Sequence, residues 1–143
     1  MGVLIDTTVL VALERSGGDL GSLREELRDE EVAISALTAS ELLHGVHRAD
    51  TAVRRGRRER FVEGLLEALP VVPFDLETAR VHARLGADLH ARGEPIGAHD
   101  LIVAATAITL GFRLASLDVR HFSRVEGIDL LDWPEATATE TAR

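Results

Sequence analysis

The sequence predicts an α/β protein, namely a three-layer α/β/α sandwich around a short, mostly parallel central sheet. Short apolar runs alternate along the chain with longer segments of helical periodicity, which is typical of strands joined by crossover helices. At 143 residues, 45% of them hydrophobic, the chain can bury roughly two-thirds of its unfolded surface in one core. No internal repeat and no interdomain linker interrupts this alternation. These observations favour a single domain.

The predicted strands are short apolar runs bounded by turn or acidic residues. The first run, VLI, ends directly at Asp6, and the fourth, RLASL, ends directly at Asp118. The expected strands are residues 3–5, 32–35, 71–74, 113–117 and 128–133.

The predicted helices lie between these strands and have recognisable ends. Asp75 can cap the helix that follows it, Pro70 ends the longest helix, and Gly111 fits the stop of the last one. That last helix is apolar nearly all round, which predicts that it lies in the core. The expected helices are residues 7–15, 19–30, 38–48, 50–69, 76–92 and 100–110.

We expect one domain over residues 1–133 and a polar tail over residues 134–143. No apolar run approaches the roughly 20 residues that a membrane helix needs. No basic leader precedes the first apolar stretch, so a signal peptide is not expected. The chain has no cysteine, which excludes disulfides and cysteine-based zinc sites and suits a reducing cytoplasm.

The charge pattern excludes several classes of activity. All 16 basic residues are arginine, so neither a Walker A phosphate loop nor Schiff-base catalysis is available. The formal net charge is −8, whereas a general nucleic-acid binder is usually basic. An acidic protein can still act on nucleic acid where cations sit among converging acids.

Acidic residues recur at the ends of predicted strands and the starts of predicted helices. Asp6 and Asp118 directly follow strands, while Glu41 and Asp100 fall in the first turn of helices. In an open parallel sheet these positions share one edge, where ligands bind. Crowded carboxylates either acquire raised pKa values or hold a metal, and all-oxygen ligation suits Mg²⁺ or Mn²⁺.

Each of these acids also has a purely structural interpretation. Thr38 and Glu41 match the T-x-x-E capping box, Asp100 can be an N-cap, and Asp118 can begin a turn. Asp6 is hardest to explain in this way, because an acid at a buried strand–helix junction needs a partner. A common site accounts for all four acids together, and capping remains compatible with it.

Four stretches of the sequence resemble the motifs of PIN-domain ribonucleases, specifically VapC toxins. They are LIDTTVLVAL, TASELLHGV, IGAHDLIVAATA and LASLDVRHFSRVEGIDLL. The resemblance covers about residues 1–133. It implies a PIN-like fold and a metal-dependent endoribonuclease that cleaves RNA phosphodiester bonds, with Mg²⁺ as cofactor and Mn²⁺ as its substitute. It further implies a toxin that is neutralised by a small antitoxin protein and that pairs as a homodimer.

The resemblance also implies roles for particular residues. The family's four catalytic and metal-binding acids fall on Asp6, Glu41, Asp100 and Asp118. Thr8 falls where many relatives have a serine or threonine close to the metal. Ser116 stands where the family often has threonine, a departure that keeps the hydroxyl group.

The stretch RRGRRER, residues 54–60, is the one concentrated basic segment of the sequence. Arg54 and Arg58 share a helical face at i, i+4 spacing. This segment is either a solvated helix face or a contact for the RNA backbone or a partner, since guanidinium groups match phosphate geometry.

The histidines are weaker candidates. His44 and His47 lie at i, i+3 spacing, but zinc sites use three or four protein ligands, which favours an exposed surface position. His99 and His121 are neighbours of Asp100 and Asp118 in the sequence, so each is either a surface residue or a substrate contact.

Other families with acids at strand ends fit less well. Phosphoaspartyl receivers and dehalogenase-like phosphatases rely on a lysine, and Thr8 stands where the latter need a second aspartate. No G-x-G-x-x-G follows the first strand. The remaining alternative is a catalytically silent PIN-like module that binds RNA or protein, and metal-dependent RNA cleavage would distinguish the two.

Overall fold

The protein's structure, a computed structural model, describes residues 2–28, 30–131 and 133. Within these residues, parallel strands form a five-stranded sheet in the order β3-β2-β1-β4-β5. The strands are β1 (Gly2–Ile5), β2 (Glu31–Ser35), β3 (Val71–Val72), β4 (Arg113–Ala115) and β5 (Leu130–Leu131). The expected polar tail, residues 134–143, lies outside the described residues.

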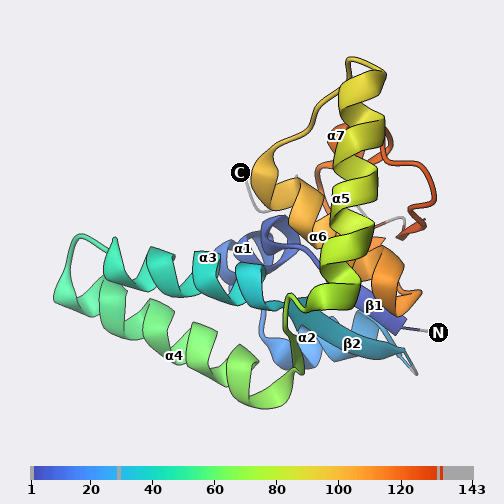
Figure 1. Cartoon of the computed structure of the whole chain (residues 1–143). Helices are drawn as coiled ribbons and strands as arrows, with labels where there is room; N and C mark the ends of the chain where they lie inside the picture. The colour runs from blue at the N-terminus through green and yellow to red at the C-terminus, as the bar shows by residue number, and fades with distance from the viewer. Residues whose placement is uncertain (1, 29, 132, 134–143) are drawn as a thin grey trace.

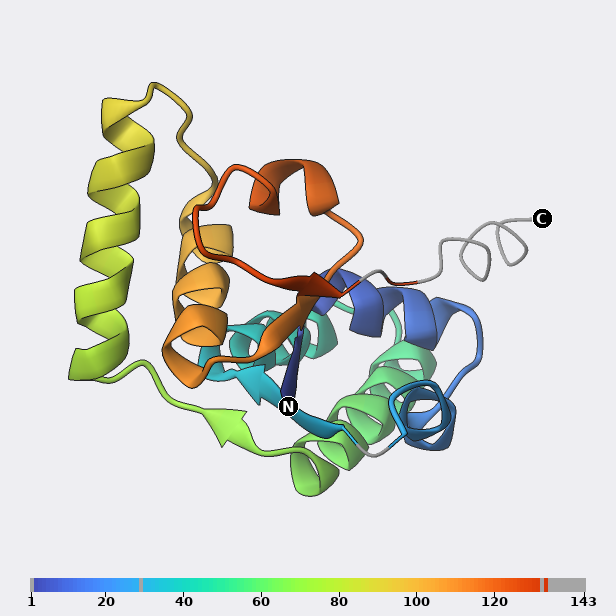
Figure 2. The same cartoon turned by 90° about the vertical axis from the view of Figure 1, so that its right-hand side faces the viewer.

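Helices cover both faces of this sheet, which confirms the predicted three-layer sandwich (Figure 1). They are α1 (Thr7–Arg15), α2 (Leu20–Glu26), α3 (Ala36–His47), α4 (Ala52–Ala68), α5 (Leu76–Ala91), α6 (Ala98–Leu110) and α7 (Val119–Phe122). Figure 2 shows α5 and α6 on one side of the strands and α1, α2 and α4 on the other. Among the described residues, no helix combines the length and the apolar character needed to cross a membrane.

The core is divided by the sheet into two apolar layers. Val3 and Ile5 of β1 point into the layer formed with α1, α2, α3 and α4, while Leu4 between them points into the layer formed with α5, α6 and α7. All three side chains are fully buried. This alternation follows from the two-residue period of a strand, and it explains why both faces of β1 are apolar.

Helix α6 is buried as its composition predicts. The hydroxyl groups of Thr106 and Thr109 donate hydrogen bonds to the carbonyl oxygens of Ile102 and Ala105, at 2.8 and 2.7 Å. Because these polar groups are satisfied within the helix, they can lie in the core at little cost. Gly111 ends the helix with a φ of 69°, a left-handed conformation that suits glycine.

The start of α3 differs from the sequence-based expectation. The helix begins at Ala36, and the N-cap is Ser35, whose hydroxyl accepts a hydrogen bond from the Thr38 backbone N–H at 3.0 Å. The predicted capping box of Thr38 and Glu41 is therefore wrong. Glu41 lies in the second turn of α3 rather than the first, so capping does not explain its presence.

Two other differences concern the C-terminal third and the strand lengths. The short helix α7 was not predicted, because four residues are too few to show a helical period. The strands expected over 71–74 and 128–133 form ladder pairs, as far as the structure describes them, only at Val71–Val72 and Leu130–Leu131, and residue 132 lies outside the described residues. Pro73 lacks the backbone N–H that a longer β3 ladder needs.

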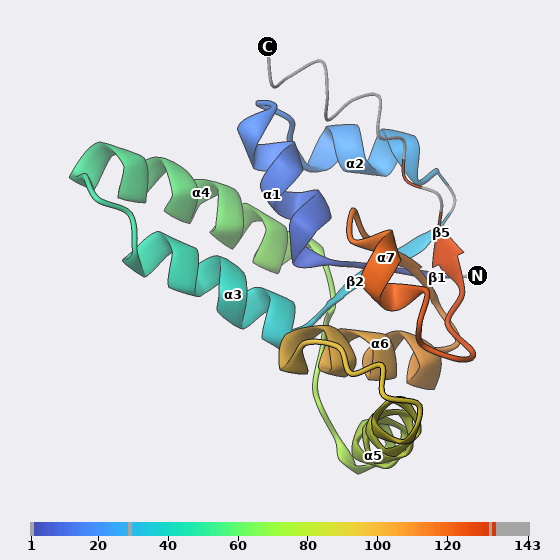
Figure 3. The same ribbon diagram turned by 90° about the horizontal axis from the view of Figure 1, so that it is seen from above.

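Helices α3 and α4 pack against each other and project away from the sheet (Figures 1 and 3). Arg58 of α4 connects them to the rest of the fold. Its Nη1 donates to the Gly45 carbonyl oxygen of α3 at 3.0 Å, and its Nε lies 3.3 Å from Oε1 of Glu14 on α1. This arginine therefore joins three helices.

Candidate metal centre

The structure brings the four sequence-predicted acids together at one edge of the sheet. Asp6 follows β1 and Asp118 follows β4 by a short turn, while Glu41 and Asp100 extend from α3 and α6. Helices α1, α3 and α6 all begin at this edge (Figure 3). All four acids line one cavity of about 680 Å³, as parallel-sheet geometry predicts.

Asp6 is the most buried of these acids, with only 4% of its surface exposed. It occupies the N-cap position of α1 but makes no side-chain capping bond. Its Oδ2 instead accepts hydrogen bonds from the hydroxyl groups of Thr8 and Ser116, both at 2.8 Å. Two neutral hydroxyls hold the carboxylate in place without neutralising its charge, so it stays available to a cation.

The same two hydroxyls connect strand ends that are far apart in the sequence. The backbone N–H of Leu117 donates to Thr8 Oγ1 at 3.0 Å, and the N–H of Asp118 donates to Ser116 Oγ at 2.9 Å. The segment that carries Asp118 is thus fixed relative to Asp6. Thr8 and Ser116 are positioning residues for the acids in this arrangement.

Glu41 is oriented by α1. The hydroxyl group of Thr7 donates to Glu41 Oε1 at 3.1 Å, and the imidazole Nδ1 of His99 lies 3.6 Å from Oε2. Sequence reasoning did not single out Thr7, because a hydroxyl 34 positions away gives no local signal for this contact. This hydrogen bond from Thr7 directs the Glu41 carboxylate from α3 into the acidic cavity.

Asp100 lies in the first turn of α6, where the N-cap is Gly97 and no side-chain capping bond forms. The N-cap interpretation of Asp100 is therefore excluded. Burial raises the pKa of this carboxyl, and the nearby charges of Asp6 and Asp118 raise it further, whereas His121 lowers it. A cation opposite Asp100 would offset the repulsion between these acids.

His121 lies closer to the acids than its position in the sequence indicated. Its Nδ1 is 2.7 Å from Asp118 Oδ2. Ligand atoms from Asp100, Asp118 and His121 all fall within 4.8 Å of one another, so one ion can contact all three. The i, i+3 spacing of Asp118 and His121 is a sequence signal that could have indicated this pair. Carboxylate oxygens are the ligands that suit Mg²⁺ or Mn²⁺.

The remaining sequence candidates lie elsewhere. Arg54 makes an ion pair with Asp50 through two hydrogen bonds of 3.0 and 3.1 Å, and it does not line the acidic cavity. His44 and His47 are exposed, and neither joins a group of three potential metal ligands in the described part of the chain.

The matching family model and the similar proteins all belong to one class of protein. The family model described as "PIN domain" matches residues 3–128. The chain is 36% identical to "Ribonuclease VapC1" of Rickettsia felis over 131 residues, which is 92% of this chain and 96% of that protein. It is 27% identical to the "tRNA(fMet)-specific endonuclease VapC" of Salmonella typhimurium, covering 91% of this chain and 96% of that one.

Solved structures agree with the fold. The DNA-bound VapBC2 structure from Rickettsia felis superimposes with a TM-score of 0.83 at 23% identity, covering 94% of this chain and all of that one. The DNA-bound VapBC structure from Salmonella typhimurium also gives 0.83, at 25% identity, covering 94% and 99%.

Proposed function

The chain belongs to the PIN-domain family, and from this premise we propose that it is a metal-dependent endoribonuclease acting as the toxin of a toxin–antitoxin pair. Residues 1–133 form its single nuclease domain. Its place of action is the cytoplasm, where RNA is found. The relatives' names support the class of reaction, since both sequence relatives described above are called RNA-cleaving enzymes.

One observation carries this proposal, namely the convergence of Asp6, Glu41, Asp100 and Asp118 on one cavity. Four carboxylates so close together repel one another unless a cation lies between them. We assign Mg²⁺ as the cofactor, with Mn²⁺ as a substitute, because the donors are mostly carboxylate oxygens. When bound, such a cation polarises the phosphodiester and activates water for attack.

The residues of this chain hold and orient the reacting groups. Thr8 and Ser116 fix the Asp6 carboxylate through their hydroxyls, and Thr7 fixes Glu41. His121 contacts Asp118 and thereby limits the rotation of its carboxylate. Hydrogen bonds to ligand side chains of this kind pre-organise a metal site.

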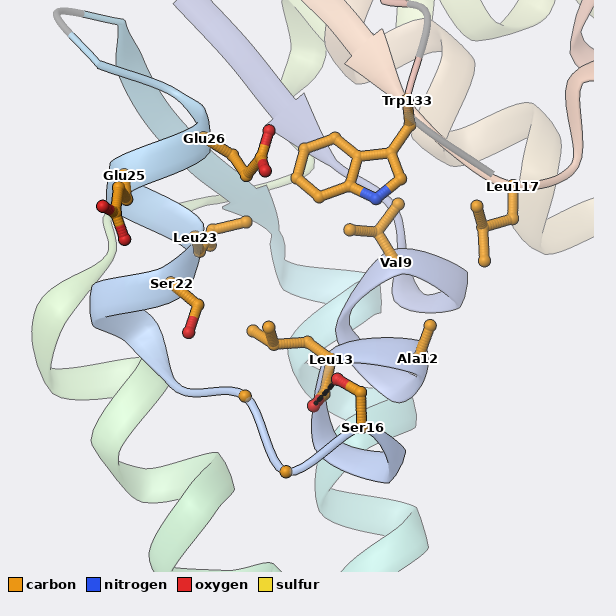
Figure 4. A pocket seen from close by; sticks show the side chains of 12 residues that line it. Val9, Ala12, Leu13, Ser16, Ser22, Leu23, Glu25, Glu26, Leu117 and Trp133 are labelled. Carbon is orange, nitrogen blue, oxygen red and sulfur yellow. Dashed lines mark hydrogen bonds between the residues drawn. The ribbon is translucent and has the colours of Figure 1, made fainter. Parts of the chain in front are cut away.

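For the antitoxin, we propose an apolar hollow between α1 and α2 of about 460 Å³ as the binding site (Figure 4). Leu13, Leu23 and Trp133 line it, and the carboxylates of Glu25 and Glu26 lie at its rim. This chemistry suits a partner segment that inserts an apolar side chain and brings a basic one. Several structural neighbours, such as VapBC from Salmonella typhimurium, are complexes named for both proteins.

For the proposed homodimer, the apolar helices α1 and α3 are the first candidate contact surfaces. Much of their apolar surface is already buried in the core, including Val9, Leu10, Leu42 and Val46. Three exposed apolar side chains lie together between β3 and the start of α5, namely Val71, Phe74 and Leu76, whereas Val53, Leu110 and Val119 are exposed on separate helices. We therefore place the homodimer contact at residues 71–76.

The test is to map RNA ends in cells that express the chain with and without its antitoxin. We expect new RNA 5′ ends and arrested growth with the chain alone, and neither when the antitoxin is present. The Asp6→Asn variant is the matched control and should give neither effect. New ends that persist with Asp6→Asn would contradict the role of the acids, and RNA binding without any new ends would favour the silent module.

A further inference from the structure

We propose that the RNA strand flanking the scissile phosphate lies in a groove that leads from the acids to Arg15 and Arg48, whose guanidinium groups bind its phosphates. This inference rests on the ribonuclease function proposed above. It names residues that neither the family motifs nor the basic cluster indicated.

The groove consists of two adjoining hollows. The acidic cavity of about 680 Å³ shares Thr7, Val11, Arg15 and Glu41 with a second cavity of about 310 Å³. Since both cavities have the same four residues in their walls, they form one continuous depression along α1. Arg15 lies at their junction, and Arg48 lines the second cavity beyond it.

The two arginines stand at matching positions on two helices that begin at the acidic site. Arg15 is the last residue of α1, seven residues after Thr8, and Arg48 is the C-cap of α3, seven residues after Glu41. Seven helical residues span about 10 Å. The backbone of Arg15 is therefore about two turns from Thr8, and that of Arg48 about two turns from Glu41, so both arginines can reach phosphates that flank the reacting one.

Neither arginine has a partner in the part of the chain that the structure describes. Both side chains are exposed, and neither makes an ion pair or a side-chain hydrogen bond with another described residue. The other charged residues of the second cavity differ in this respect, since Glu14 is paired with Arg58 at 3.3 Å. The hollow next to the acids thus presents two uncommitted positive charges.

The charge distribution favours RNA as the occupant. A chain with a formal net charge of −8, whose active site is lined by four carboxylates, repels a polyanion almost everywhere. Substrate must therefore meet local positive charge close to the site, and guanidinium groups bind phosphate well. In the basic stretch 54–60, by contrast, Arg54 is held by Asp50, and Arg55 donates to the Ala49 carbonyl oxygen. The exposed Arg57 and Arg60 line neither cavity.

The test measures RNA affinity across a salt series, using a mixed-sequence single-stranded RNA oligonucleotide in Ca²⁺ to limit cleavage. Arg15→Gln, Arg48→Gln and the double variant are compared with wild type. The matched control is Arg80→Gln with Arg84→Gln, two exposed arginines on α5 that line neither cavity. This control removes the same net charge, and melting temperatures verify that each variant folds.

For single-stranded RNA, each lost phosphate contact should reduce the slope of log affinity against log salt by about 0.7, so the double variant should lose about 1.4. In Mn²⁺, its KM should rise about tenfold while kcat changes by less than about threefold, because these contacts bind substrate and transition state alike.

A slope equal to that of the α5 control would overturn the inference and assign the groove to a protein partner or to solvent. If the slope equals that of the control but wild type cleaves RNA in Mn²⁺, the ribonuclease function stands and only the groove assignment fails. If wild type neither binds nor cleaves RNA, the proposed function fails, and the groove inference fails with it.

Discussion

Single hydroxyl groups organise much of the acidic site. Thr8 and Ser116 each donate to Asp6 and each accept a backbone N–H from the turn after β4. A buried carboxylate with 4% exposure needs such partners, because an unpaired buried charge is costly. Asp100 differs from Asp6, since burial and the like charges of Asp6, Asp118 and Glu41 raise its pKa.

The Asp100→Asn variant should therefore make the metal-free protein more stable at neutral pH. A raised pKa in the folded state means that the ionised carboxylate opposes folding above the ordinary aspartate pKa of 3.8. The stabilisation by Asn should be largest above the raised pKa and should vanish as the pH falls towards 3.8. Thermal melting in chelator across this pH range measures it.

Glu63→Gln is the control for Asp100→Asn, because it removes one negative charge from an exposed position on α4. The melting temperature of Glu63→Gln should stay close to that of wild type across the same pH range. A lower melting temperature for metal-free Asp100→Asn at neutral pH would show instead that Asp100 stabilises α6 through the helix dipole.

Among the elements, the α3–α4 pair is joined to α1 by a shared apolar core and also by the polar contacts of one arginine. Arg58 donates to the Gly45 carbonyl oxygen and pairs with Glu14, so one arginine of the basic segment has a structural role. The sequence had left a solvated face or a contact with RNA or a partner open for this segment. The acids themselves are positioned by the sheet, because Asp6 and Asp118 follow β1 and β4, and the helices that carry Glu41 and Asp100 pack against it.

Replacing Arg58 with methionine should lower the free energy of unfolding by about 1 kcal/mol, because two partly exposed polar contacts are lost while the aliphatic packing is kept. Arg57→Met on the same helix is the control, since Arg57 is exposed and makes no contact of this kind in the described chain. Urea unfolding compares the two. Equal stability of both variants would mean that the Arg58 contacts contribute nothing measurable.

At the scale of the whole molecule, the order of strands and helices could be predicted because most elements have a recognisable periodicity. The edge where the acids meet could also be predicted, because the ends of parallel strands share one edge. The N-cap at Ser35 could not be predicted from the sequence, since Ser35 also fitted the end of a strand. The hydroxyl contacts of Thr8 and Ser116 join residues more than 100 positions apart, and local patterns do not encode such pairs.

Divalent metal should stabilise the folded molecule, because it binds the assembled acids and not the unfolded chain. Mg²⁺ and Mn²⁺ should both raise the melting temperature relative to EDTA, because carboxylate oxygens suit both ions. Zn²⁺ should not be required. Differential scanning calorimetry measures this, and equal melting in EDTA and millimolar Mn²⁺ would count against a metal site.

The central claim is that four acids at one sheet edge hold the metal that RNA cleavage requires. The most direct measurement is RNA cleavage by the purified protein in Mn²⁺, with EDTA and the Asp100→Asn variant assayed in parallel. Cleavage in Mn²⁺ that disappears in EDTA and in Asp100→Asn, while both proteins remain folded, is the predicted result. Cleavage that persists in EDTA, or in the folded Asp100→Asn variant, would contradict the claim.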